Sequence, residues 1–323
     1  MRGRVRRPPV RRASVRRVVV GVGGAVGAAA VLAAVLAHRR DEFVTALHAA
    51  PVGILVAATA LQLVALVARS GAWWVCVDAA GGTVARRALF RAASLGYLGS
   101  QLNSQLGAAA RIAGLRRAAP EAAPRVPALI AAEIPILLVE GGLAAIASVT
   151  LIGPLGLPWW VPLVCLAVAL AVGGALHGMC RRREHGFWSG VAVLGSVAGR
   201  ARLVGLVLVA VFAQIARNWL MLRAVGVDAS VFDATAVLIA MVTLSQLPVG
   251  PSVGAAATVL ILGSDGPAAA AAAGVLLTAT GTVGALTYVA WAALDRLALG
   301  LTGREPAAPV APVVPVAAAP PVR

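Results

Sequence analysis

Long apolar stretches alternate with short arginine-containing segments along most of the chain. A helix needs roughly 20 mainly apolar residues to cross a bilayer core about 30 Å thick. Six stretches meet this requirement closely. We expect each of them to form a membrane-spanning helix, over residues 18–37, 51–68, 126–152, 157–179, 203–222 and 267–294.

Two further apolar stretches, 88–110 and 234–262, are interrupted by residues that break helices. Irregular backbone at membrane depth is tolerated only where protein covers it or where it lines a cavity. We therefore expect each stretch to enter and leave the membrane on one side, as a re-entrant helical hairpin. The loop glycines and prolines that support this prediction are Gly107, Pro248, Gly250, Pro251 and Gly254.

The distribution of arginines favours the same arrangement. Positively charged residues of polytopic membrane proteins gather on the cytoplasmic side. With both hairpins re-entrant and the N-terminus inside, 24 arginines lie in cytoplasmic segments and three in outer segments. If the first interrupted stretch crossed the membrane, the basic segments 69–95 and 111–125 would lie on opposite sides. We therefore expect a multi-pass protein of the cytoplasmic membrane with both termini in the cytoplasm.

This topology predicts an inverted repeat, a plan found in many transporters. The halves are about 18–152 and 157–298, and each runs span, span, re-entrant hairpin, span. A repeated tripeptide supports the repeat, because Ser-Gln-Leu occurs at 100–102 and again at 245–247. Arg69 has a counterpart in Arg217, 148 residues later. The predicted organisation is a basic tail over 1–17, a membrane domain over 18–300 and a Pro/Ala-rich tail over 301–323.

Composition and charge exclude several classes of protein. The 323-residue chain is 60% hydrophobic and 12% charged, with a mean hydropathy of +0.90, whereas an ordinary soluble domain is about 25% charged. Its net charge is +16, and all 28 of its basic residues are arginines. These arginines flank apolar stretches, so we expect them to set membrane topology and not to bind nucleic acid. Three isolated cysteines and four scattered histidines predict no metal or cofactor site, and no catalytic motif predicts an enzyme.

Ionisable residues inside the predicted spans are candidates for function, because a charge at the bilayer centre costs about 2.5–3.5 kcal/mol or more. Glu133 and Glu140 are seven residues apart and therefore share a helix face, with Pro135 as a potential kink between them. Inside the membrane Arg217 needs an acid or a phosphate as its partner, and Glu140 is one candidate acid. The alternative is that the Arg217 side chain extends to the membrane interface. Gln62 on the second span and Arg69 just after it are placed to meet it from the other half.

Polar residues in the interrupted stretches predict a site for a lipid headgroup. The first stretch is rich in amides and hydroxyls and ends at an arginine, an arrangement suited to phosphate. The alternative is a tightly packed broken helix in which Arg111 only anchors the topology. The predicted headgroup-binding residues are Arg111, Arg217, Arg69, Asn103, Gln105, Gln246 and Ser252, with Glu133 and Glu140 balancing the charge.

Together these motifs resemble the lysylphosphatidylglycerol synthase transmembrane regions, also called flippase-like domain proteins. The first loop resembles the family pattern N-x-x-x-P-G-x-x-G-[DE]-x-x-R at Asn103, Gly107 and Arg111, although Ala108 stands where an acid is expected. The second loop resembles P-x-S-P-G-G-x-G-x-x-E over 248–254, with Ala257 at the position of the glutamate. The following span carries Glu133, which is similar to a glutamate of the family.

The resemblance implies an all-α membrane protein that translocates a lipid, without the aminoacyl transfer of the synthetase domain, which the sequence does not contain. We expect the substrate to be an anionic phospholipid or a polyprenyl-phosphate glycolipid. Two alternatives remain at this stage. One is a non-transporting scaffold for an envelope-biosynthesis enzyme such as a glycosyltransferase. The other is a lipid transferase that uses Glu133 and Glu140 as acid and base.

Overall fold

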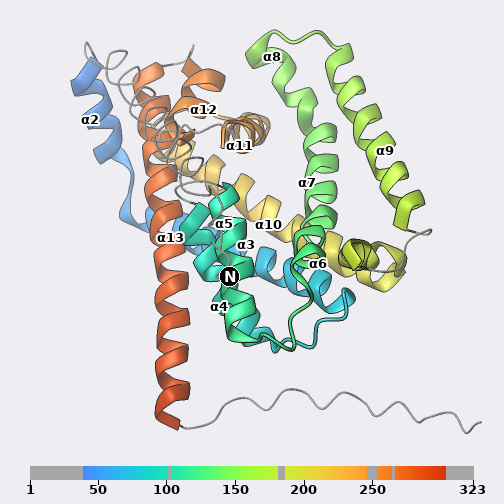
Figure 1. Cartoon of the computed structure of the whole chain (residues 1–323). Helices are drawn as coiled ribbons and strands as arrows, with labels where there is room; N and C mark the ends of the chain where they lie inside the picture. Colours follow the sequence, from blue (N-terminus) through green and yellow to red (C-terminus); the bar gives the residue numbers. More distant parts are fainter. Residues whose placement is uncertain (1–38, 101–103, 181–185, 246–252, 264–265, 303–323) are drawn as a thin grey trace, which may run out of the picture.

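The computed structural model describes residues 39–100, 104–180, 186–245, 253–263 and 266–302. Throughout these residues every element of regular structure is a helix (Figure 1). Several of the helices are long and apolar enough to cross a membrane. The protein is therefore an all-α polytopic membrane protein, as the sequence predicts.

Of the six predicted spans, the second, third, fifth and sixth are long apolar helical segments in the structure. They are α3 (Val52–Ala79), the segment α6 to α8 (Val126–Leu155), α10 (Val197–Ala224) and α13 (Pro267–Thr302). The fourth predicted span is α9 (Trp160–Cys180), which has 21 residues. The first, over 18–37, lies outside the described residues.

The third span is interrupted near its start. Its first part, α6 (Val126–Ala131), ends just before Glu133, and α7 (Ile134–Ala147) begins immediately after it. Pro135 occupies the first turn of α7, where the missing N–H of proline interrupts no hydrogen bond of α7 but ends the preceding helix. The helix is therefore interrupted next to Pro135, at the position where a kink was predicted. The segment finishes with η2 (Ser148–Leu151) and α8 (Ile152–Leu155).

Each interrupted stretch folds into two short helices. The first forms α4 (Arg86–Ser100) and α5 (Ser104–Ala118), and the second forms α11 (Val231–Leu244) and α12 (Val253–Leu262). A helix of 15 residues, the longest of these four, is only about 22 Å long. None of the four can cross a bilayer core of about 30 Å alone, which agrees with the re-entrant prediction.

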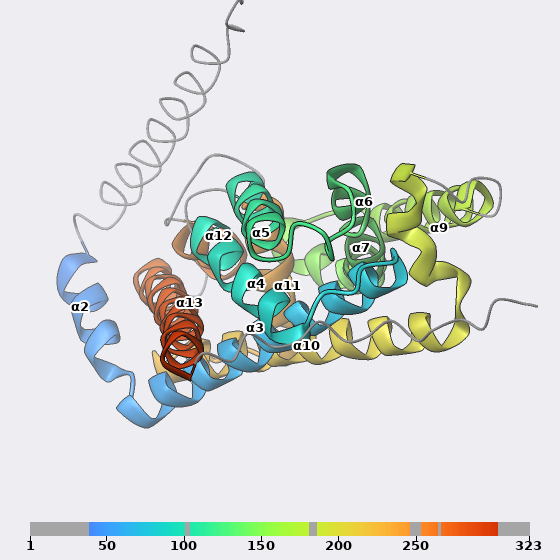
Figure 2. The ribbon, with the colours of Figure 1, turned by 60° about the horizontal axis from the view of Figure 1, so that its bottom comes forward.

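Two long helices form the base on which the others lie. Figure 2 shows α3 and α10 side by side along one edge, with the hairpins, α6, α7 and α13 above them. The two run in opposite directions, because Gly71 faces Leu206 while Gln62 faces Arg217. At their crossing four small residues let the backbones approach, namely Ala65, Ala68, Ala210 and Ala213.

The two halves correspond closely in register. Helices α3 and α10 both have 28 residues and begin 145 residues apart, as do α4 and α11. Every residue recorded as buried in α10 lies 145 positions after a buried residue of α3. With α3 and α10 antiparallel, this agrees with the predicted inverted repeat. In this register Gln214 occupies the position equivalent to Arg69, so the predicted correspondence of Arg69 with Arg217 at 148 residues was wrong.

Several segments predicted as cytoplasmic loops are instead helical. Helix α3 continues through Arg69 to Ala79, and α5 continues to Ala118. An arginine ends an apolar stretch in the sequence but does not end these helices, because arginine is itself a good helix former. Residues Gly186–Gly195 form a 3-10 helix, η3, that packs on α6, and the segment 38–50, which was predicted to lie outside, contains α2 (Arg40–Ala49).

Candidate functional site

The first element of the candidate site is an ion pair between α3 and α7. Arg69 donates from Nη2 to Oε2 of Glu140 across 2.6 Å. The two side chains are 34% and 19% exposed, so both are largely withdrawn from the surface. The pair links the second and third spans of the first half. It also neutralises one of the three arginines predicted to bind a headgroup.

A second ion pair lies on the same face of the third span. Arg111 of α5 donates from Nη2 to Glu133, at the bend between α6 and α7. The Arg111 guanidinium also lies over the indole of Trp73, 4.6 Å from the ring centroid. Because Glu133 and Glu140 are seven residues apart, they present their carboxylates to the same side, where each meets one arginine. The predicted polar stripe is thus a neutral cluster of two cations and two anions.

Several buried polar atoms in and beside this cluster have no hydrogen-bond partner in the described part of the chain. Nε1 of Trp73, Nε of Arg111 and Oε1 of Glu133 are buried and have no hydrogen-bond partner within the described residues. Trp73 itself is completely buried. Two donors and one acceptor are therefore left without a partner on three side chains that are linked through Arg111, which pairs with Glu133 and lies over Trp73. Such orphaned buried groups are rare in proteins and mark a place where water or a ligand group is accommodated.

Arg217 is placed very differently from the other two arginines. It lies on α10 and is only 6% exposed. Its Nη1 donates to Oε1 of Gln62 on α3, and its Nη2 donates to the Leu277 carbonyl on α13 across 2.7 Å. Opposite the guanidinium α13 carries Gly281, at which an added Cβ would stand 3.6 Å from Nη2. No carboxylate of the described residues forms an ion pair with Arg217.

One of the predictions for Arg217 is confirmed and two are wrong. Gln62 does meet it from the other half, as expected. Glu140 was the wrong partner, because Arg69 of α3 takes that carboxylate. The alternative in which Arg217 extends to the interface is also wrong, because its guanidinium is held between three helices.

Other predicted site residues lie elsewhere or outside the described chain. Gln105 is exposed on α5. Gly107 and Gly254 are buried helix contacts, since an added Cβ would stand 2.7 Å from the Gly96 carbonyl and 2.5 Å from the Gly274 carbonyl. Both glycines therefore serve close packing. The residues outside the described chain are Asn103, Gln246, Pro248, Gly250, Pro251 and Ser252.

The structure also contains polar contacts that the sequence did not suggest. The Tyr288 hydroxyl of α13 donates to Oγ of Ser70 across 3.0 Å, next to Arg69 on α3. Nearer the end of α13, Asp295 approaches Arg91 of α4 to 3.6 Å. The only available signal was a polar residue inside an apolar stretch, and that signal does not identify the partner.

Neither a family model nor a curated protein nor a solved structure matches the chain. The resemblance to flippase-like proteins consequently stays a prediction, and the functional argument depends on the geometry of the described residues.

Proposed function

We propose that the protein binds an anionic, phosphate-bearing lipid and translocates it across the membrane. A phospholipid or a polyprenyl-phosphate glycolipid has the required chemistry. One observation carries the proposal: Arg217 is a buried cation without an acidic partner in the described residues. An unpaired charge in a low-dielectric interior is costly, and intramembrane ionisable residues that persist despite this cost belong mostly to substrate and ion pathways.

The neighbours of Arg217 suit a transient anion site. Gln62 and the Leu277 carbonyl satisfy two guanidinium nitrogens without neutralising the charge. A phosphate oxygen is a stronger acceptor than either, because charge-assisted hydrogen bonds are roughly twice as strong as neutral ones. A headgroup that reaches Arg217 would therefore displace these neutral acceptors, which belong to α3 and α13.

Access to Arg217 requires the helices to separate. Arg217 contacts α3 and α13 from α10, so the site lies where the two halves meet. The described conformation is closed over this site, as expected for one state of a transporter that rocks one half against the other. In the first half the neutral pairs Arg69–Glu140 and Arg111–Glu133 would keep α3 and α5 attached to the third span during that motion.

The test is lipid translocation in proteoliposomes, with fluorescent phosphatidylglycerol beside fluorescent phosphatidylcholine. We expect the wild-type protein to move phosphatidylglycerol faster than empty vesicles do. Arg217→Gln removes the charge and keeps hydrogen-bonding groups, and we expect it to slow translocation at least about tenfold, since one charged contact is worth about 1.5–3 kcal/mol. Arg217→Lys should restore part of the rate, and Arg296→Gln, an exposed arginine on α13, should leave it unchanged.

The outcomes separate transport from the scaffold alternative. Translocation no faster than in empty vesicles, for both lipids and for a polyprenyl phosphate, would overturn the proposal and favour a scaffold. Translocation that is equally fast in Arg217→Gln would retain transport but remove Arg217 from the path. Thermal unfolding of each variant in detergent serves as the folding control.

A further inference from the structure

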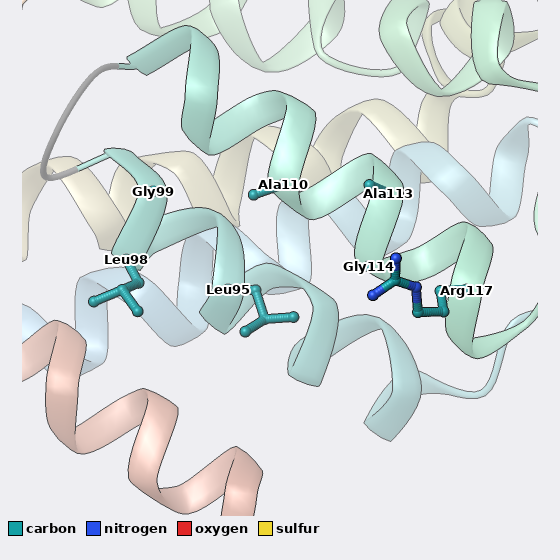
Figure 3. A pocket seen from close by; sticks show the side chains of 7 residues that line it. All are labelled: Leu95, Leu98, Gly99, Ala110, Ala113, Gly114 and Arg117. Atoms are coloured by element: carbon teal, nitrogen blue, oxygen red, sulfur yellow. The ribbon is translucent and has the colours of Figure 1, made fainter. Parts of the chain in front are cut away.

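The α4–α5 hairpin carries a hollow on its outer side. Its volume is about 410 Å³, within the range of roughly 300–1,000 Å³ that is common for ligand sites. Leu95 and Leu98 of α4 form one wall, and α5 forms the other (Figure 3). The remaining lining residues are Gly99, Ala110, Ala113, Gly114 and Arg117.

Small residues create this hollow. On the α5 side the lining residues before Arg117 are alanine and glycine, whose small side chains leave the outer surface of the hairpin hollow beside Leu95 and Leu98. An added Cβ at Gly114 would come within 3.3 Å of Leu95. Leu98 is 39% exposed, so the wall opens outward and does not belong to the core. The floor and walls are apolar except at one end.

That end is cationic. Arg117 is exposed and forms no ion pair with any carboxylate of the described chain. The hairpin is antiparallel, because Gly96 faces Arg111 while Ala92 faces Gly114. Arg117 therefore lies toward the open base of the hairpin, and Leu98 toward the turn (Figure 3). Arg86 and Arg116 also lie at this base, which the arginine distribution places at the cytoplasmic side.

We infer that this hollow is a docking site for an anionic phospholipid, with an acyl chain along Leu95 and Leu98 and the phosphate at Arg117. The polarity matches a lipid in a leaflet, because the cation lies at the predicted interface and the apolar walls extend into the membrane. An arginine at the interface donates to lipid phosphate and adds about 1 kcal/mol of electrostatic attraction to anionic membranes. The site is separate from Arg217 and does not require that the protein transports lipid.

Photo-crosslinking tests this inference on the full-length protein in vesicles. The probe is phosphatidylglycerol with a photoactivatable group in its acyl chain, and phosphatidylcholine with the same group is the reference. We expect the peptides that contain Leu98 or Ala113 to be labelled at least about threefold more by phosphatidylglycerol. Arg117→Gln should reduce the labelling to the phosphatidylcholine level, whereas Arg296→Gln should not.

A second variant tests the shape of the hollow. Ala113 is exposed, so Ala113→Trp fills the space without disturbing buried packing, and we expect it to reduce labelling by both lipids severalfold. Ala167→Trp, at an exposed alanine of α9, is the matched control. Thermal unfolding establishes that each variant is folded.

Equal labelling by the two lipids, unchanged by Arg117→Gln, would overturn the inference and identify the hollow as ordinary lipid-exposed surface. The result is independent of translocation. Preferential labelling without translocation would support the docking site while the transport proposal fails. Translocation without preferential labelling would reject the docking site alone.

Discussion

Gly281 offers a direct test of the unpaired charge at Arg217. An added Cβ at this position would stand 3.6 Å from Nη2 and 3.8 Å from Nη1 of Arg217, at ordinary contact distances. A carboxylate attached to that Cβ can reach the guanidinium without moving α13. Gly281→Asp therefore introduces the missing acid, and Gly281→Asn introduces a side chain of the same shape without the charge.

The expected gain is set by the cost of a buried unpaired charge. Removing one partner of a buried ion pair costs about 3–5 kcal/mol, and supplying a partner to Arg217 recovers part of this. Desolvation of the new carboxylate and its partial competition with Gln62 and the Leu277 carbonyl reduce the gain. We expect Gly281→Asp to be about 1–3 kcal/mol more stable than Gly281→Asn.

The assay combines thermal unfolding in detergent with translocation of phosphatidylglycerol. Gly281→Asp should raise the midpoint of unfolding above that of Gly281→Asn and abolish translocation, because the acid occupies the position that the phosphate needs. Gly281→Asn should retain most of the translocation rate. A Gly281→Asp variant that is less stable than Gly281→Asn would refute the view that Arg217 lacks a counter-charge. Unimpaired transport in a stabilised Gly281→Asp would refute its role in the path.

Two further predictions concern the fold. Gly190 of η3 lies so close to α6 that an added Cβ would overlap the Ala128 carbonyl oxygen. Gly190→Ala should therefore lower the free energy of unfolding by about 1–3 kcal/mol. Gly195 has open space around it, so Gly195→Ala should leave the stability measured by thermal unfolding unchanged. Single cysteines at Ser100 and Ser245, in a protein whose native cysteines are replaced, should react with impermeant thiol reagents from opposite sides of the membrane. Labelling of both from one side would contradict the inverted repeat.

The spans were predictable because their signal is local. An apolar stretch must be buried in lipid or protein whatever its neighbours are, and α3, α10 and α13 appear where the hydropathy places them. The ends of the helices were less predictable. Helix α3 continues past Arg69 to Ala79, and the arginine itself is paired with Glu140, a residue 71 positions away in the sequence.

Partners in the candidate site depend on which helices are neighbours, and one sequence does not determine this. The shared face of Glu133 and Glu140 followed from their spacing, and both carboxylates do receive arginines. The assignment of Arg69 and not Arg217 to Glu140 required the packing of α3 against α7. Helical periodicity orients a side chain within its own helix, whereas the identity of the facing residue is a property of the tertiary structure.

Among the described residues Arg69 and Arg111 are paired with glutamates whereas Arg217 is not, and this difference has a thermodynamic reason. An unpaired arginine at membrane depth costs at least about 2.5–3.5 kcal/mol, so three of them would approach the whole stability of a typical protein, about 5–15 kcal/mol. Pairing Arg69 and Arg111 with glutamates leaves one such cost, at Arg217. The first residues of α6 and α13 are 141 positions apart, and the same interval relates Glu140 to Gly281. The second half therefore carries Gly281 at the position equivalent to Glu140, and Arg217, which is equivalent to Ala72 of α3, has no acid from either half among the described residues. The remaining uncompensated charge lies at the contact between the halves, and in the proposed function it is the charge that meets the lipid phosphate.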